Sequence, residues 1–145
     1  MYQIWIKSAT FDRQHATSDA ALATVKLGLQ RYPASPKLHL IHGQLLLAQH
    51  PPNVQGAREA FGLGVKKCPT EPALWIMSSR LEEESGVRIK ARALLEKARS
   101  HNPKDEDVWL ESVKVEERDG SGAAKGMLAR GEYFHNSPSF SPVPG

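Results

Sequence analysis

The chain has 145 residues, 40% of them hydrophobic and 24% charged, and its formal net charge is +3 at pH 7. This composition is typical of a chain that folds around an apolar core. It has no apolar run of about 18 residues, and its first residues lack a basic segment followed by an apolar one, so we predict neither a membrane span nor a secretory signal. The single cysteine, Cys68, cannot form an internal disulfide, which favours a reducing compartment.

A recurring pattern of an aromatic anchor, a later acid and a closing proline predicts the fold class. The tryptophan anchors are Trp5, Trp75 and Trp109, and a carboxylate follows each by seven residues, at Asp12, Glu82 and Glu116. The closing prolines Pro33, Pro69 and Pro103 each lie six residues before the next anchor position, of which the first is His39. A period of about 34 residues is typical of helical solenoids. We therefore predict an all-α fold, a right-handed α–α superhelix of about four helical hairpins.

The hairpins can be placed in chain order from their start and stop signals. The first helix of each hairpin is predicted over 2–15, 36–49, 71–85 and 105–119. The second helix of each is predicted over 18–31, 53–67, 87–101 and 122–135. Ser35 followed by Pro36 is typical of a helix start, and Gly86 and Gly120 are placed to end helices in a left-handed conformation.

These helices group into one repeat array and a tail. The array covers 1–135, with repeats at about 1–34, 35–69, 70–103 and 104–135. Residues 136–145 are rich in proline and serine and are predicted to be disordered. Because no polar capping repeat is evident at either end, we expect a fragment of a longer array or a truncated product.

Small residues on the second helices complement the large anchors. Ala21, Ala57 and Ala91 each lie 12 residues before a closing proline, where a partner helix can approach closely. The predicted structural framework is therefore Trp5, Trp75, Trp109, Ala21, Ala57, Ala91, Pro33, Pro69 and Pro103. Glu82, late in a first helix, and Arg92, early in the following second helix, are the predicted interhelical ion pair of that hairpin.

No catalytic, metal-binding or cofactor-binding residues are predicted. His39 and His42 share a helix, but a metal site usually needs three or four convergent ligands. The run from Gly62 to Lys67 lacks the spacing of a phosphate-binding loop and falls on a predicted helix, where glycine favours close packing. We therefore predict a protein that is not an enzyme and has no small-molecule substrate.

Two sequence features resemble a known repeat family. A tryptophan followed seven residues later by an acid, with Ala57-Arg58 and Ala91-Arg92 in the second helices, resembles the HAT (half-a-tetratricopeptide) repeat of RNA-processing scaffolds. The stretch from Leu74 to Asp119 is similar to the pre-mRNA-processing factor six family of the U5 snRNP. That resemblance implies a nuclear scaffold in pre-mRNA splicing that bridges the U5 and U4/U6 components of the tri-snRNP. Its partners would be spliceosomal snRNP proteins, with any RNA contact indirect.

Two other functions remain open from the sequence. One is a general tetratricopeptide-type adaptor outside splicing, for which Lys7, Lys37, Arg80 and Lys114 supply basic residues near the anchors. The other is direct RNA binding, which the sequence pI of about 9.1 permits. A steep salt dependence of RNA affinity would identify the second.

Overall fold

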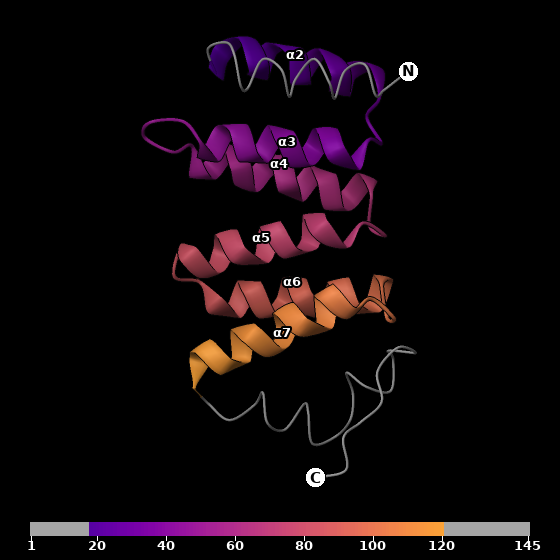
Figure 1. Ribbon diagram of the computed structural model, residues 1–145, viewed down its shortest axis with the longest axis vertical. Helices are drawn as coiled ribbons and strands as arrows, with labels where there is room; N and C mark the ends of the chain where they lie inside the picture. Colours follow the sequence, from indigo (N-terminus) through magenta and orange to yellow (C-terminus); the bar gives the residue numbers. More distant parts are fainter. Residues whose placement is uncertain (1–17, 121–145) are drawn as a thin grey trace. The chain divides into compact units, whose positions relative to one another are not determined.

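The computed structural model describes residues 18–120, which form six α-helices and no strand. These helices are α2 (Ser18–Arg31), α3 (Pro36–Leu47), α4 (Val54–Lys67), α5 (Pro72–Glu84), α6 (Arg88–His101) and α7 (Glu106–Asp119) (Figure 1). Each begins and ends within two residues of its predicted range. The predicted helices 2–15 and 122–135, the anchor Trp5 and the tail 136–145 lie outside the described residues.

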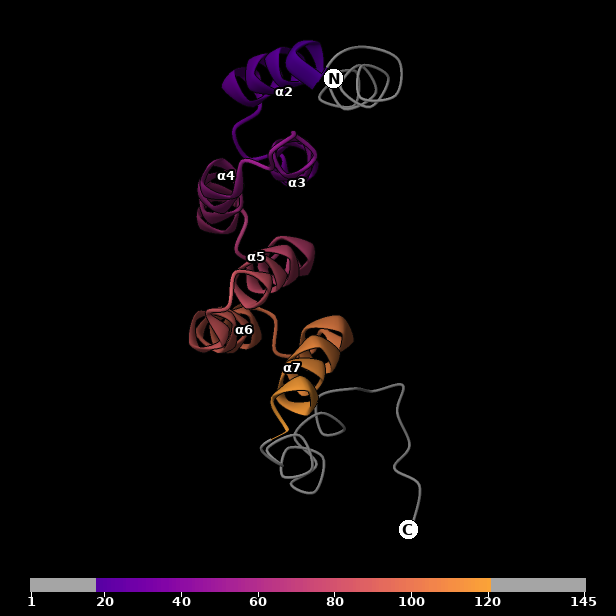
Figure 2. The same ribbon diagram turned by 90° about the vertical axis from the view of Figure 1, so that its left-hand side faces the viewer.

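The chain divides into two compact units at a boundary inside α5. The N-terminal unit runs from Met1 to Ser78 and the C-terminal unit from Ser79 to Gly145. In the N-terminal unit α3 packs against both α2 and α4, and in the C-terminal unit α6 packs against α7. Figure 2 views α3 nearly end-on and shows it beside α4.

Side chains that accept from free backbone N–H groups explain where three helices begin. The Ser35 hydroxyl accepts from the Leu38 N–H at 3.4 Å, and the Asn53 side chain accepts from the Gly56 N–H at 2.9 Å. The Asp105 carboxylate accepts from the Val108 N–H at 3.0 Å. Each contact satisfies one of the backbone donors that a helix leaves unpaired in its first turn.

Glycine follows the ends of α5 and α7, as predicted. Gly120 has a φ of 70° and its N–H donates to the carbonyls of Glu116 and Glu117 at the end of α7. Gly86, with a φ of 87°, forms the turn between α5 and α6. An L-residue with a side chain is strained in this left-handed region, so glycine is the residue that suits both turns.

The core of the N-terminal unit depends on a close approach between α3 and α4. Phe61 of α4 is fully buried, and its ring occupies the space that a Cβ on Gly43 of α3 would need. Gly64 is also tightly placed, because a Cβ there would lie 3.0 Å from the His39 Cβ. Gly62 has open space around it, so the predicted close packing at this run applies to Gly64 and not to Gly62.

The three predicted alanines lie on the buried faces of the second helices. Ala21 of α2, Ala57 of α4 and Ala91 of α6 are each 0% exposed. A larger side chain at these positions would have no room without moving a helix.

Replacing Gly43 with alanine should destabilise the chain even though alanine favours helix. We expect the Gly43→Ala variant to lose about 1–3 kcal/mol of unfolding free energy because the buried Phe61 ring has to move. Thermal unfolding followed by circular dichroism measures this. The matched control is Gly62→Ala, for which we expect no loss or a gain of up to about 1 kcal/mol. Equal melting temperatures for the two variants would contradict the close approach of α3 to the Phe61 ring.

Candidate functional site

The anchor rings form one hydrogen bond that recurs through the described chain. The Trp75 ring N–H donates to the carbonyl oxygen of Pro69 at 2.8 Å. The Trp109 ring N–H donates to the Pro103 carbonyl at 3.0 Å. Each bond joins the first turn of a helix to the closing proline six residues earlier, and we call it the anchor bond. The closing prolines therefore supply an acceptor as well as ending the preceding helix.

His39 forms the same bond with a different ring. Its Nε2 lies 2.7 Å from the carbonyl oxygen of Pro33. A carbonyl oxygen only accepts, so Nε2 carries the hydrogen. Nδ1 is buried without a hydrogen-bond partner, and the residue is 1% exposed. Histidine can therefore replace tryptophan here because it keeps a ring N–H within reach of the proline carbonyl.

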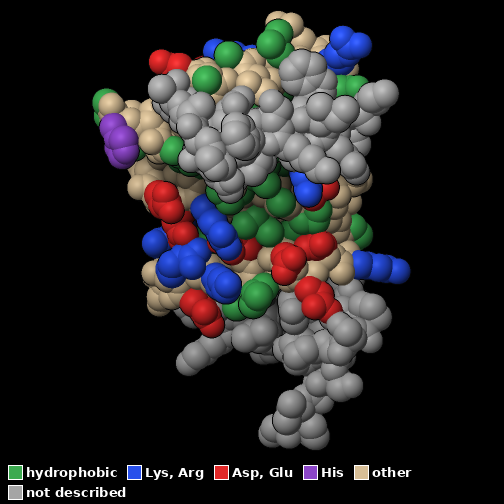
Figure 3. All heavy atoms as spheres, turned by 45° about the horizontal axis from the view of Figure 1, so that its top comes forward, with side chains coloured by type: hydrophobic (Ala, Val, Ile, Leu, Met, Phe, Trp, Pro, Cys, Tyr) green, Lys and Arg blue, Asp and Glu red, His purple; other side chains and the backbone are tan. Residues whose placement is uncertain are grey.

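A chain of ion pairs, which we call the ion-pair network, connects the helices of the C-terminal unit. It comprises Arg80, Arg88, Arg92 and Arg118 with Glu83, Glu111, Glu116 and Asp119. Figure 3 shows Lys and Arg side chains in blue lying against Asp and Glu side chains in red on one face of the molecule. Networks hold charges more firmly than isolated surface pairs do.

Glu111 is the most deeply buried acid of the network. The Arg80 guanidinium donates to both of its carboxylate oxygens, through Nε at 3.1 Å and Nη2 at 2.9 Å. Burial alone would raise the pKa of Glu111, but the hydrogen bonds and charge of Arg80, with the charge of Arg118, bring the pKa below its ordinary value. The Glu111 side chain is 4% exposed while that of Arg80 is 50% exposed, so the pair lies at the edge of the core.

Arg92 pairs with α7 and not with its predicted partner, Glu82. Its guanidinium donates to both oxygens of Glu116, at 2.7 and 2.9 Å, and to Asp119 at 2.6 Å. Glu116 and Asp119 are three residues apart on α7, so both carboxylates face α6 and can hold one guanidinium. The prediction had the correct residue types but the wrong register, because the acid comes from the following hairpin.

Arg88 and Arg118 link these two pairs into one network. Arg118 contacts Glu83 at 2.7 Å and Glu111 at 3.6 Å. Arg88 contacts Asp119 at 2.8 Å and Glu83 at 3.6 Å. Glu83 is therefore shared by two arginines, and Asp119 by Arg88 and Arg92. The sequence prediction missed Arg80, Arg88 and Arg118 as pairing residues; their only signal was a basic residue beside each acidic run.

Several charges of the network oppose the helix dipoles. Acids cluster at the ends of α5 and α7, where a helix favours cations, and Arg88 stands at the start of α6, where a helix favours anions. Each such placement costs about 0.3–1 kcal/mol when the charge is isolated. The charges are therefore explained by pairing between helices and not by the stability of any single helix.

A cavity of about 220 Å³ lies between α6 and α7 beside the network. Its lining comprises Arg92, Leu95, Glu96, Arg99, Ser112, Val115 and Glu116. The Arg99 guanidinium donates to the Ser112 hydroxyl at 2.7 Å and lies 5.1 Å from the centre of the Trp109 ring. The lining combines charged side chains with an apolar base, and it presents no nucleophile with an adjacent base.

Residues 18–120 contain neither a candidate metal-binding group nor a helix that could span a membrane. No group of three His, Cys, Asp or Glu there could hold a metal ion. No helix within that range has the length and apolar character needed to cross a bilayer.

Comparisons with known proteins relate this chain to splicing factors. Pre-mRNA-splicing factor prp1 of Schizosaccharomyces pombe is 38% identical over 93 residues, which cover 64% of this chain and 10% of that protein. Human pre-mRNA-processing factor 6 is 40% identical over 62 residues, which cover 43% of this chain and 7% of that protein. The chain resembles the pre-mRNA-processing factor six family. Its repeat pattern resembles that of HAT-repeat arrays. The chain spans about a tenth or less of the length of these relatives, and no family model matches it.

Solved structures show the fold class of this chain. A crystal structure of MamA superposes with a TM-score of 0.67 at 13% identity, covering 93% of this chain and 77% of MamA. A second MamA structure gives a TM-score of 0.66 at 16% identity, covering 99% of this chain and 79% of MamA. At this identity the likeness shows the fold alone, which is an all-α helical-repeat solenoid, as predicted.

Loss of the Trp75 ring should destabilise the chain more than loss of the Trp109 ring. Trp75 is 5% exposed, whereas Trp109 is half-buried. We expect Trp75→Ala to cost about 3–5 kcal/mol, and Trp109→Ala to cost less because less of its ring leaves water on folding. Urea unfolding of the full chain measures both. Trp75→Phe isolates the anchor bond, and we expect it to cost about 1 kcal/mol. A larger loss of stability for Trp109→Ala than for Trp75→Ala would contradict this ranking of the anchors.

Removing the arginine that pairs with Glu111 should destabilise the C-terminal unit. We expect Arg80→Met to cost about 1–3 kcal/mol, since Glu111 is then left without a bidentate partner at a buried position. Because the Arg80 side chain is 50% exposed, we expect a smaller loss of unfolding free energy than for a fully buried ion pair. The control is Lys90→Met, a change of the same type on an exposed part of α6, which should alter stability by less than about 0.5 kcal/mol. Calorimetry measures the melting temperatures of both variants. Equal decreases would contradict a specific stabilising role for the Arg80–Glu111 pair.

Proposed function

We propose that the chain acts in pre-mRNA splicing, in the nucleus, as a scaffold without enzymatic activity. The observation that carries this proposal is the 38% identity with a pre-mRNA-splicing factor over 93 residues, a stretch long enough to include more than one complete hairpin. Human pre-mRNA-processing factor 6 and Saccharomyces cerevisiae pre-mRNA-splicing factor 6 support it. Stacked helical repeats usually bind other macromolecules, which suits a scaffold.

The finer proposal is that the chain bridges components of the U5 snRNP and the U4/U6-U5 tri-snRNP by contacting snRNP proteins. It rests on the resemblance of Leu74–Asp119 to the pre-mRNA-processing factor six family. The cavity between α6 and α7 gives such a partner a place to dock, because Glu96 and Arg99, which are outside the ion-pair network, line it. A polar rim of this kind favours specific over non-specific protein binding.

The repeat boundaries are part of the same proposal. Repeats at about 35–69 and 70–103 each begin after a closing proline and contain an anchor bond to that proline. The framework residues Trp75, Trp109, Ala57 and Ala91 then hold the hairpins together, and the partner-binding residues are other, exposed side chains. Repeats at about 1–34 and 104–135 extend the array by the same period.

Affinity capture from nuclear extract tests the scaffold. The tagged 145-residue chain should enrich U5, U4 and U6 snRNAs, and it should retain U5 proteins after RNase treatment. Trp75→Ala serves as a folding control, because a scaffold contact requires intact hairpins and should disappear in a variant that unfolds. Capture of non-spliceosomal proteins alone by the folded chain would favour the general adaptor and overturn the splicing proposal.

A further inference from the structure

Four of the six Lys and Arg residues in the described part of the N-terminal unit lie at one end of it. There α2 and α4 end and α3 begins, at the same side of the ribbon in Figure 1. Arg31 lies in the last turn of α2, Lys66 and Lys67 lie in the last turn of α4, and Lys37 is the second residue of α3. We call these four residues the basic end. Glu71 is the one acid near them in sequence among the described residues.

A hydrogen bond joins two turns at the basic end. The Cys68 thiol, directly after α4, donates to the carbonyl oxygen of Ala34 at 3.3 Å. Ala34 lies in the turn between α2 and α3, three residues after Arg31. Lys66 and Lys67 are therefore brought from α4 to the turn that follows Arg31, although more than 30 residues separate them along the chain.

The charges of the basic end are not neutralised within the described chain. Arg31, Lys37, Lys66 and Lys67 are all exposed. Within residues 18–120 none of the four forms an ion pair or a side-chain hydrogen bond. The arginines of the ion-pair network, by contrast, each have a carboxylate within 3 Å. Among the described residues, the basic end thus presents unpaired positive charge to solvent.

Favourable interaction with helix dipoles explains only some of the four basic residues. Arg31, Lys66 and Lys67 stand at helix C-termini, which favour cations. Lys37 stands in the first turn of α3, which favours anions and contains no acid. At the corresponding start of α7, Asp105, Glu106 and Asp107 occupy the turn. The excess charge is therefore specific to the end formed by α2, α3 and α4.

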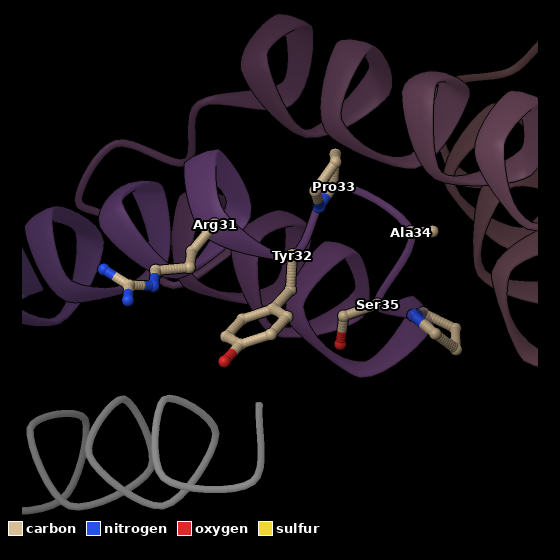
Figure 4. Close-up of a pocket in the computed structure, with 6 residues that line it drawn as sticks. Arg31, Tyr32, Pro33, Ala34 and Ser35 are labelled. Carbon is tan, nitrogen blue, oxygen red and sulfur yellow. The ribbon is translucent and has the colours of Figure 1, made fainter. Parts of the chain in front are cut away.

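An apolar cavity adjoins Arg31 at the same end. Its volume is about 450 Å³, and its lining includes Arg31, Tyr32, Pro33, Ala34, Ser35 and Pro36 (Figure 4). In Figure 4 the Tyr32 ring is drawn between the side chains of Arg31 and Ser35. An aromatic ring beside cations is the combination with which proteins bind single-stranded nucleic acid, since bases stack on the ring while cations contact phosphates.

We propose that the basic end binds single-stranded RNA, with Arg31, Lys66 and Lys67 contacting backbone phosphates and the cavity at Tyr32 accepting a base. Exposed lysines suit phosphates, which carry one charge per nucleotide, better than they suit the carboxylates of a peptide, which need a shaped groove. This inference goes beyond the proposed scaffold role, because protein contacts alone would satisfy that role. Its failure would leave the splicing proposal standing.

Fluorescence anisotropy with a labelled single-stranded oligouridine of about 12 nucleotides tests the proposal. We expect Lys66→Glu/Lys67→Glu to weaken binding at least about tenfold at low salt, and to reduce the salt slope by about 0.7 for each phosphate that the variant no longer neutralises. The control Lys97→Glu/Lys104→Glu makes the same change in net charge at exposed positions of the C-terminal unit, and it should weaken binding less than about threefold. Circular dichroism establishes that both variants are folded.

Tyr32 provides a second, independent variant. We expect Tyr32→Leu, which keeps an apolar side chain but no aromatic ring, to weaken binding about tenfold with an unchanged salt slope. Three outcomes would overturn the proposal. The first is that the folded chain does not bind the oligouridine at about 50 mM salt. The second is that the two charge-reversed variants weaken its binding equally. The third is that the chain binds polyglutamate as tightly as it binds RNA.

Discussion

The hydrogen bond from an anchor ring to the closing proline recurs at the start of α3, α5 and α7, and it constrains how each of these helices follows the preceding turn. It fixes the first turn of one helix against the turn that precedes it, and so fixes the direction in which the chain enters the next repeat. The bond requires a ring N–H at one position and a carbonyl six residues earlier, which is why the anchor and the proline recur at constant spacing. Tryptophan and histidine both meet that requirement, whereas phenylalanine would fill the space but has no ring N–H to donate.

The ion-pair network has a different physical basis from the anchor bonds. The two residues of an anchor bond are six residues apart in the chain. The bond therefore forms locally, between a helix and the turn that precedes it. Arg92 and Glu116 are 24 residues apart, and they can pair only once α6 and α7 pack together. Pairs of this kind contribute little to the formation of single helices. They favour one arrangement of packed helices over others, because any other packing leaves acids at a helix C-terminus without cations.

The helices and anchors could be predicted from the sequence because the signals for them are local. Capping residues such as Ser35, and a repeat period with prolines, fix helix limits within a few residues. The partner of Arg92 could not be fixed in this way. Glu82 precedes it by ten residues and Glu116 follows it by 24, and a repeat pattern supplies equivalent acids on both sides. The packing of the Phe61 ring on Gly43 was equally hidden, since a small residue indicates close approach but does not identify the ring that approaches.

Arginine and lysine therefore have different roles in the two units. In the C-terminal unit the network uses arginine, whose planar guanidinium binds two carboxylate oxygens at once, and the paired charge is unavailable to a ligand. In the N-terminal unit the basic end consists of three exposed lysines and one exposed arginine, and no carboxylate of the described residues pairs with them. A cation kept exposed without a structural partner contributes nothing to packing, and its removal costs little stability. Its positive potential is directed at solvent, where a polyanion would gain most from it because each phosphate contact releases a counterion.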